Sequence, residues 1–142
     1  MIVLDTTVLV YAVGSDHPLR EPCRELIGAI ASGRLRATTT VEVLQEFAHV
    51  RARRRDRDDA ARRAGEYLDL LAPLLVVGED DLREGMRLFA RGERLGAFDA
   101  VLAAAASRSS ADALVSADAA FAGAEVAHVL PDAAGVAALL VG

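Results

Sequence analysis

Short apolar runs alternate along this chain with longer segments in which apolar and polar positions recur at helical spacing. A short apolar run predicts a buried strand, because parallel strands covered on both faces are hydrophobic throughout. The first run ends abruptly at Asp5, followed by the hydroxyls of Thr6 and Thr7. The expected strands are Ile2–Leu4, Leu35–Thr38, Leu74–Gly78, Ala113–Ser116 and Val126–Leu130.

The intervening segments predict helices from their periodicity and their start and stop residues. Strands that alternate with helices in one continuous chain predict an α/β fold, a three-layer α/β/α sandwich with a mostly parallel central sheet. A length of 142 residues predicts a single domain, residues 1–142. Three helices are expected at Thr6–Val13, Glu79–Arg94 and Ala97–Ser107. Another is opened by His17-Pro18 and runs to Ser32-Gly33, and one runs from Thr40 into the Arg51–Arg55 run. A further helix is capped by Asp58 and runs through Leu71, and a short last one is capped by Asp132.

Composition restricts the function more than the fold. Hydrophobic residues make up 53% of the chain, which is ample for such a core. Aromatic residues make up only 4%, which argues against the stacking platforms that hold single-stranded bases. The net charge of −5 argues against binding nucleic acid through overall positive charge, although a local basic surface remains open.

Cellular location is suggested by the single cysteine and by the start of the chain. Cys23 has no second cysteine to pair with, so no intramolecular disulfide or multi-cysteine metal site can form. The apolar stretch from Met1 to Val13 has no basic leading region, is interrupted by Asp5 and is too short to span a bilayer. We therefore expect a cytoplasmic protein with no membrane partner.

Four predicted elements carry an acid toward one edge of the sheet. Asp5 leaves the first strand, Asp99 lies in the first turn of the Ala-rich helix, and Asp118 follows the strand that ends at Ser116. Strand ends and the helix starts that follow them share one rim of such a sheet, where ligands bind. Glu46 lies further inside its helix, so its convergence with the others is less directly predicted.

Clustered carboxylates repel one another and stay ionised at neutral pH only when a cation offsets the repulsion. Mg²⁺ and Mn²⁺ prefer oxygen ligands, and a site of this kind suits phosphodiester hydrolysis. Each acid also has an ordinary explanation, because Asp5 and Asp99 lie at helix starts, Asp118 fits a turn, and Glu46 fits a solvated helix face. The joint placement of the four is the stronger indication.

Four segments spread over nearly the whole chain carry a resemblance to a known family. They are Leu4–Ala12 (LDTTVLVYA), Val43–Phe47 (VLQEF), Gly96–Ala105 (GAFDAVLAAA) and Leu114–Asp118 (LVSAD). With these segments the sequence resembles the PIN-domain ribonucleases and, within them, the VapC-type toxins of bacterial toxin–antitoxin pairs. No single segment is specific, but four in this order are.

The resemblance implies a PIN-like fold and a metal-dependent endoribonuclease that cleaves cellular RNA. By matching position, Asp5, Asp99 and Asp118 would ligate Mg²⁺ or Mn²⁺, and Glu46 would position a second ion or the attacking water. We expect Thr6 and Ser116 to support these acids, Ser116 by orienting a ligand or a water. The resemblance further implies a cognate VapB-type antitoxin and a homodimer.

Two positions leave questions open within this resemblance. The family commonly has Asn where this chain has Thr7, a departure expected to weaken hydrogen bonding around Asp5 without removing a ligand. Glu42 competes with Glu46 as the helix acid, because the two are one helical turn apart and share a face. We favour Glu46, since its sequence context matches the family better.

Basic residues gather in one segment, interleaved with acids. Such a run is ordinarily a solvated face laced with ion pairs. The alternative is a strip that follows RNA phosphates, with Arg53 and Arg54 as its candidate residues. The cluster comprises Arg51, Arg53, Arg54, Arg55, Arg57, Arg62 and Arg63, with Asp56, Asp58 and Asp59 among them.

Histidines do not suggest a metal site, because His17, His49 and His128 lack ligand spacing. His49 lies three residues after Glu46 and could approach the acids.

Alternative functions are a housekeeping PIN nuclease, a DNA nuclease, a metal-dependent phosphatase, or a PIN-like module that binds RNA or protein without turnover. Haloacid-dehalogenase phosphatases want a second Asp two residues after the first, where this chain has Thr7.

Overall fold

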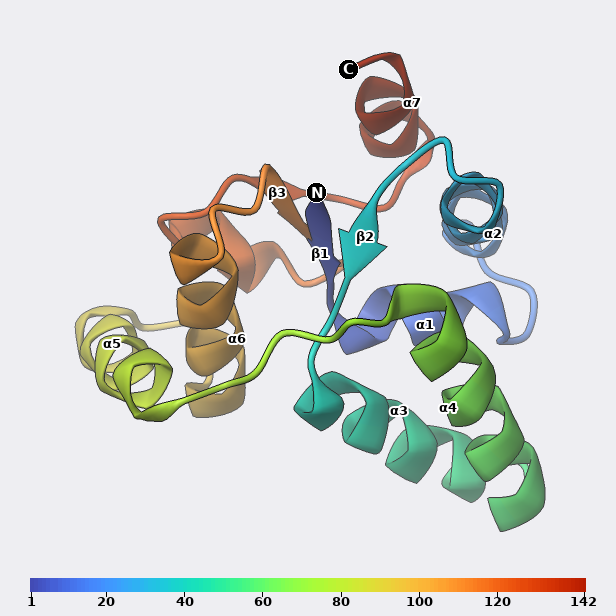
Figure 1. The fold of residues 1–142 in the computed structure, drawn as a ribbon, viewed down its shortest axis with the longest axis horizontal. Helices are drawn as coiled ribbons and strands as arrows, with labels where there is room; N and C mark the ends of the chain where they lie inside the picture. Colours follow the sequence, from blue (N-terminus) through green and yellow to red (C-terminus); the bar gives the residue numbers. More distant parts are fainter.

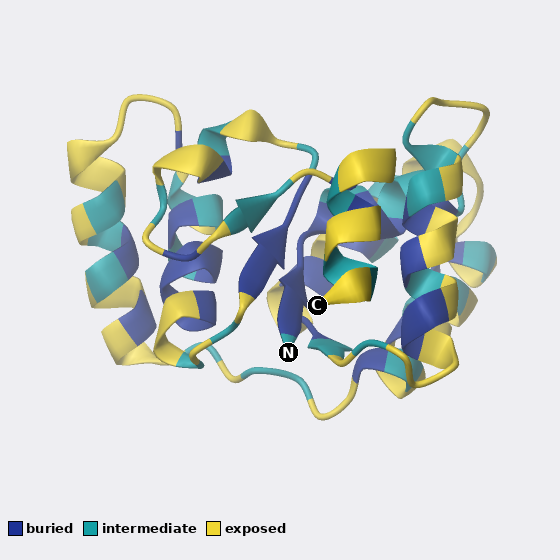
Figure 2. Ribbon diagram, turned by 90° about the horizontal axis from the view of Figure 1, so that it is seen from above, coloured by how far each residue is buried: buried dark blue, intermediate teal, exposed yellow.

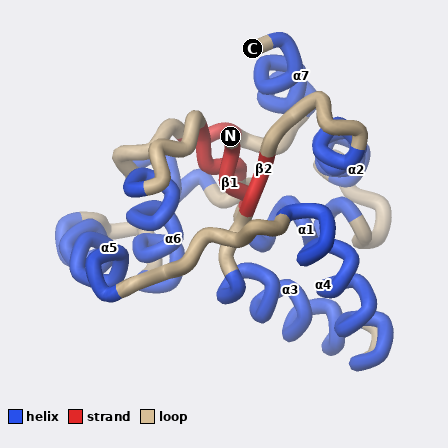
Figure 3. The backbone as a smooth tube through the Cα atoms, viewed as in Figure 1, coloured by secondary structure: helices blue, strands red, loops and turns tan.

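The computed structural model describes residues 1–142 and contains one parallel sheet of four strands (Figures 1 and 3). The strands are β1 (Ile2–Leu4), β2 (Ala37–Thr38), β3 (Ala113–Val115) and β4 (His128–Val129), in the order β2-β1-β3-β4. In the central pairs, Ile2 is opposite both Ala37 and Ala113. The strand that leads to Asp5 therefore lies inside the sheet and is buried along its length.

Helices cover both faces of this sheet, as the three-layer α/β/α prediction requires. In Figure 2, α5 and α6 lie on one side of the buried strands, and the remaining helices lie on the other. The helices are α1 (Thr6–Ala12), α2 (Arg20–Ala31), α3 (Val41–Arg54), α4 (Arg57–Leu71), α5 (Glu79–Arg91), α6 (Ala97–Arg108) and α7 (Ala133–Val141), with a 3₁₀ helix, η1 (Ala119–Gly123), before β4. No helix combines the length and apolarity needed to cross a bilayer.

Helix starts are set by side-chain caps. Thr40, Asp56 and Asp132 each accept a hydrogen bond from the backbone N–H three residues later, which satisfies a donor that the helix leaves free. Because Asp56 supplies this cap for α4, the prediction that Asp58 caps this helix was wrong. Asp58 lies instead in the first turn, where its charge suits the helix dipole.

The predicted strand Leu74–Gly78 is also wrong. This segment forms only an isolated parallel bridge, in which Leu75 N donates to Thr39 O at 2.9 Å. It passes beyond the end of β2, which is only two residues long, so no ladder can continue. Val76 is 80% exposed and its carbonyl accepts a hydrogen bond from Arg108, whereas Leu74 and Leu75 are partly buried against the core.

Close packing of α5 on α6 builds one wall of the molecule. Gly85 faces Val101 so closely that an added Cβ would lie 2.8 Å from the Val101 Cα atom. Arg108, at the end of α6, binds the buried Asp81 carboxylate through two hydrogen bonds of 2.6 and 2.9 Å. These hydrogen bonds, the largest cause, keep the pKa of Asp81 below its ordinary value. The pairing fixes the start of α5 against α6.

Candidate active site

Asp5 occupies the position of a helix cap without acting as one. It is the N-cap residue of α1, yet its side chain makes no cap hydrogen bond. Its Oδ2 atom instead accepts hydrogen bonds from Ser116 Oγ at 2.6 Å and Thr7 Oγ1 at 3.1 Å. Asp5 as a whole is only 4% exposed. The ordinary explanation of Asp5 as a capping residue therefore does not describe its contacts.

Ser116 connects the ends of β1 and β3. Its hydroxyl donates to Asp5 and accepts a 3.0 Å hydrogen bond from the Asp118 N–H. The Asp118 Oδ1 atom in turn accepts from Ala120 N at 2.9 Å and caps η1. His128 on β4 binds the Ser116 carbonyl through Nε2 at 2.9 Å. A buried hydroxyl thus fixes where Asp5 lies relative to the Asp118 backbone, while the Asp118 side chain remains exposed.

Glu46 comes to the same place from α3. Thr6 Oγ1, at the start of α1, donates a 2.8 Å hydrogen bond to Glu46 Oε2. Glu42, one turn earlier, lies along the same cleft but makes no side-chain hydrogen bond. Thr6 therefore holds the carboxylate of Glu46 and not that of its rival.

Asp99 has a pKa raised to about 6. The largest cause is its burial, and the negative charges of Asp5, Asp118 and Glu46 follow in that order. The four acids are therefore electrostatic neighbours although they come from four separate elements. None of the four forms an ion pair with an arginine, a histidine or the chain terminus, so their repulsion is not offset by the protein.

A cleft of about 890 Å³ separates α3 from the α5–α6 wall. Asp5, Glu46 and Asp99 line it, whereas Asp118 and Ser116 do not. No arginine lines it, and the chain contains no lysine. The other lining residues are Thr40, Glu42, Val43, Gln45, His49, Val77, Leu82, Met86, Gly96, Ala97, Phe98, Val101 and Leu102.

The acids converge without forming a ready-made metal cage. As the side chains stand, no three His, Cys, Asp or Glu residues are grouped closely enough to hold a metal ion. The donor set itself fits a hard divalent cation, because it consists of carboxylate oxygens that have no cationic partner. Mg²⁺ keeps several of its waters and needs only one or two direct carboxylates, so a loose cluster of this kind suits it better than a tight cage would.

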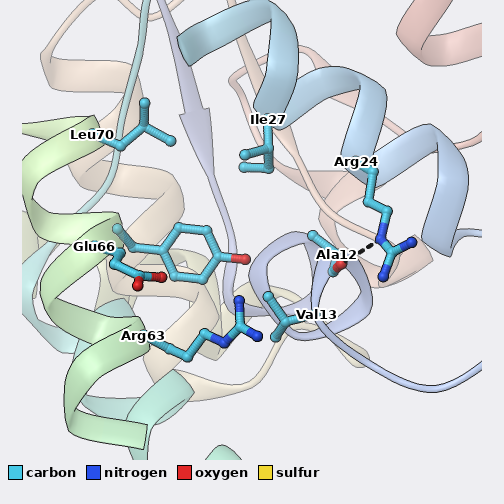
Figure 4. A pocket seen from close by; sticks show the side chains of 8 residues that line it. Ala12, Val13, Arg24, Ile27, Arg63, Glu66 and Leu70 are labelled. Atoms are coloured by element: carbon cyan, nitrogen blue, oxygen red, sulfur yellow. Dashed lines mark hydrogen bonds between the residues drawn. The ribbon is translucent and has the colours of Figure 1, made fainter. Parts of the chain in front are cut away.

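A second cavity, of about 230 Å³, lies between α1, α2 and α4, away from the acids (Figure 4). Its walls are mostly apolar, and Arg24 Nε donates to the Ala12 carbonyl across one side at 3.0 Å. Tyr67 reaches from α4 to α1, where its hydroxyl donates to Leu9 O at 2.9 Å. The contacts join helices to one another, and none involves the acidic cleft.

The arginine cluster divides into paired and unpaired members. Arg51 is 8% exposed and donates to Asp59 and to the Val13 carbonyl, and Arg62 pairs with Asp59 and Glu66. Arg53 and Arg54, at the exposed end of α3, form no ion pair. The ion-pair interpretation thus describes Arg51 and Arg62, of which only Arg51 is buried. The charges of the two candidate RNA-binding residues are not compensated.

Two residues of the site received no role in the sequence analysis. Thr7 was expected to weaken the hydrogen bonding around Asp5, but it donates to Asp5 and accepts from Ala117 N at 2.9 Å. Its hydroxyl directly after an Asp-Thr pair was the available signal. Phe98 is 88% exposed at the cleft, and its position beside Asp99 was the signal for that residue.

Comparison with known sequences places the chain in a family. The PIN-domain family profile matches residues 2–126. Ribonuclease VapC7 of Mycobacterium tuberculosis is 56% identical over 142 residues, covering 99% of this chain and 98% of the relative. Ribonuclease VapC23 of the same species is 36% identical over 101 residues, covering 70% of this chain and 78% of the relative.

Solved structures share the fold. The crystal structure of VapC20 of Mycobacterium tuberculosis, a toxin that cleaves the sarcin–ricin loop, superposes with a TM-score of 0.74 at 18% identity, covering 89% of this chain and 96% of that one. FitAcB from Neisseria gonorrhoeae gives a TM-score of 0.75 at 20% identity, covering 92% and 98%. With four acids at one edge of a parallel sheet and these relatives, this chain belongs to the PIN-domain family, among its VapC-type members.

Proposed function

We propose that this protein is a metal-dependent endoribonuclease and the toxin of a VapBC-type toxin–antitoxin pair. The observation that carries the proposal is the convergence of Asp5, Glu46 and Asp99 on one cleft, where burial and the neighbouring carboxylates raise the pKa of Asp99. A fold does not gather four unpaired carboxylates without a cost in stability, so their convergence is best explained by a cation and a phosphate that bind there. The similarity to ribonucleases VapC7 and VapC23 supports RNA as the substrate.

The metal would be Mg²⁺ or Mn²⁺, held by Asp5, Asp99 and Asp118 directly or through water. When bound, such an ion polarises the phosphate and lowers the pKa of a bound water. Its positive charge would also offset the repulsion that raises the pKa of Asp99. Asp99 would then be ionised at neutral pH and able to serve as a ligand.

The chain's own residues orient the reacting groups. Ser116 and Thr7 both donate to the Oδ2 atom of Asp5, which lines the cleft, and leave its Oδ1 atom without a side-chain partner. Thr6 fixes one oxygen of Glu46, which leaves the other to accept a proton from a water that attacks phosphorus. The water oxygen bonds to phosphorus, and the bond to the leaving oxygen breaks.

The substrate is proposed as a class and not as one molecule. At 18% identity, VapC20 shares the fold, so its sarcin–ricin loop is not carried over to this chain. We propose cleavage of single-stranded or looped cellular RNA in the cytoplasm. A VapB-type antitoxin that occludes the cleft and a homodimeric state complete the proposal, as the similarity to VapC proteins implies.

The test is incubation of the purified protein with total RNA, with Mn²⁺ and with a chelator. We expect discrete RNA fragments only with Mn²⁺, and none from the Asp99→Asn variant. Asp69→Asn, the same change on the exposed surface of α4, is the matched control and should cleave like the wild type. Equal cleavage by the Asp99→Asn variant would remove this residue from the chemistry.

Alternative activities are separated with other substrates. Turnover of single-stranded DNA in preference to RNA would indicate a DNA nuclease, and turnover of a phosphate monoester would indicate a phosphatase. RNA binding without any cleavage would indicate a silent PIN-like module. Growth arrest on expression, relieved by a DNA-binding protein encoded directly upstream, would distinguish a toxin from a housekeeping nuclease.

A further inference from the structure

Phe98 is the most exposed aromatic side chain in the chain. It lies in the first turn of α6, immediately before Asp99, and lines the acidic cleft. Its side chain is 88% exposed, whereas Phe47, Tyr67 and Phe121 are buried in the core. Phe89, the other exposed phenylalanine, is 46% exposed on α5 and does not line the cleft.

Packing does not explain this position. The core-facing residues of α6 are Leu102 and a row of alanines, and Phe98 adds no buried contact to them. Alanine also has a higher helix propensity than phenylalanine. The fold therefore does not require this large apolar ring, which is available to contact a ligand that enters the cleft.

The charge of the cleft restricts what that contact can be. Its charged lining residues are Asp5, Glu42, Glu46 and Asp99, with no arginine. An RNA strand that enters is repelled by these carboxylates wherever a metal ion does not neutralise them. Binding close to the cleaved bond therefore needs a contact that does not depend on phosphate charge. An aromatic ring supplies one, because every base has a π-face on which it can stack.

We infer that Phe98 stacks on an unpaired nucleobase next to the phosphodiester that is cleaved. The inference rests on the proposed ribonuclease function and specifies how that site holds its substrate. Phe98 and Asp99 are consecutive residues in the first turn of α6 and both line the cleft, so a base on Phe98 would lie beside the acids. Low aromatic content argues against a platform for several bases, but one ring is sufficient for one base.

The test compares intact RNA with RNA that lacks one base. After the cleavage site has been mapped with the wild type, oligonucleotides with a single abasic residue on either side of it are cleaved by the wild type and by the Phe98→Ala, Phe98→Leu and Phe98→Trp variants. We expect Phe98→Ala and Phe98→Leu to raise KM at least about fivefold with little change in kcat, and Phe98→Trp to retain the wild-type KM. One of the two abasic oligonucleotides should raise the KM of the wild type by a similar factor. The same oligonucleotide should leave the KM of Phe98→Ala unchanged.

Controls separate this inference from its alternatives. Phe89→Ala removes an exposed phenylalanine outside the cleft and should leave KM unchanged. If the abasic residue raised KM equally for the wild type and for Phe98→Ala, the stacking contact would be overturned. Loss of a dimer in sedimentation, with abasic sensitivity retained, would show that Phe98 meets a second copy and would also overturn it. A wild type that cleaves no RNA would refute the ribonuclease itself, whereas an unchanged KM in Phe98→Ala with active wild type refutes stacking alone.

Discussion

Ser116 Oγ donates a 2.6 Å hydrogen bond to Asp5 Oδ2 and thereby joins the ends of two neighbouring strands inside the candidate site. Both residues are buried, so the carboxylate depends on this hydroxyl and on Thr7 for its position. The sequence predicted that Ser116 supports the acids by orienting a ligand or a water, but it did not predict this direct contact with Asp5.

Ser116→Ala should lower both stability and activity. Losing a hydrogen bond to a buried charge should cost about 1–3 kcal/mol in the free energy of unfolding. RNA cleavage should fall roughly 10–100-fold, as when a partner that orients a metal ligand is lost. Ser109→Ala, which removes a hydroxyl bonded to Ala106 O at the far end of α6, is the matched control and should keep full activity. Full activity in Ser116→Ala would show that Thr7 alone orients Asp5.

Glu46→Gln and Glu42→Gln should differ sharply in their rates of RNA cleavage. Glu46 accepts a hydrogen bond from Thr6 and contributes to the raised pKa of Asp99, whereas Glu42 does neither. We expect Glu46→Gln to reduce Mn²⁺-dependent cleavage about 100-fold or more, the effect of losing a general base or ligand. Glu42→Gln should stay near the wild-type rate. The reverse ranking, measured by single-turnover kinetics, would assign the role to Glu42.

Asp99→Asn should stabilise the metal-free protein at neutral pH. The pKa of Asp99 is raised from 3.8 to about 6 in the fold, so the folded state holds the proton more tightly than the unfolded state. The Asp99 contribution to stability is therefore complete below pH 3.8 and is lost as pH rises through about 6. The carboxyl is half-buried and partly screened by water, so removing it should add roughly 1 kcal/mol and raise Tm by about 2–4 °C at pH 7.

Thermal unfolding across this pH range checks the prediction. The wild type should lose stability between pH 4 and 6 relative to Asp99→Asn, and the two should converge at the acidic end. Mn²⁺ should narrow the difference at pH 7, because a bound cation stabilises the ionised wild type. Parallel stability curves for the two proteins would mean that Asp99 titrates normally.

Gly85→Ala should destabilise the protein, although alanine favours helix. The added Cβ would lie 2.7 Å from Val101 Cγ2 and 2.8 Å from its Cα, so α5 must move away from α6. We expect a loss of about 1–3 kcal/mol in the free energy of unfolding and a lower affinity for RNA, because α5 and α6 form one wall of the cleft.

The matched control for that change is Gly65→Ala in α4. An added Cβ there meets nothing within 4 Å, so helix propensity alone should act and stabilise the fold by about 0.5–1 kcal/mol. Chemical denaturation of both variants measures the contrast. Equal effects in the two helices would show that the contact between Gly85 and Val101 relaxes freely.

Reversing the charge of Arg53 and Arg54 tests the RNA strip. Both are exposed and lack an ion pair, so their charge is available to phosphate. RNA binding is measured in the Asp99→Asn background, where RNA should not be cleaved. If RNA passes over the end of α3, adding Arg53→Glu and Arg54→Glu should weaken RNA binding. The slope of log affinity against log salt concentration should then fall by about 2. Arg34→Glu with Arg36→Glu makes the same charge change before β2, at the opposite edge of the sheet, and should have less effect.

Buried strands and helix periodicity were predicted well because burial on both faces leaves a plain hydrophobic pattern. β1 and β3 lie where their apolar runs indicated, with every residue buried. The Leu74–Gly78 run failed because hydrophobicity does not show whether a neighbouring strand is long enough to pair with. Val76 is apolar, but it has no partner strand and lies in solvent.

The acids were brought to one edge by topology, which sequence order predicts through the carboxyl ends of parallel strands. The choice between Glu42 and Glu46 was not decidable in that way, since both lie on one helix face. It depends on a contact across the fold, from Thr6 to Glu46, 40 residues apart. The contacts of Thr7 with Ser116 and Ala117 could not be predicted for the same reason, because these partners come more than a hundred residues later.

The strand order also governs when the cleft can first exist during synthesis. β1 emerges first, yet it lies between two strands made later, and Ser116 follows Asp5 by 111 residues. A nascent chain on the ribosome therefore carries Asp5 without the hydroxyl and the neighbouring carboxylates that surround it in the finished fold. The acidic site can therefore form only after Asp118, the last of its four acids along the chain, has been synthesised.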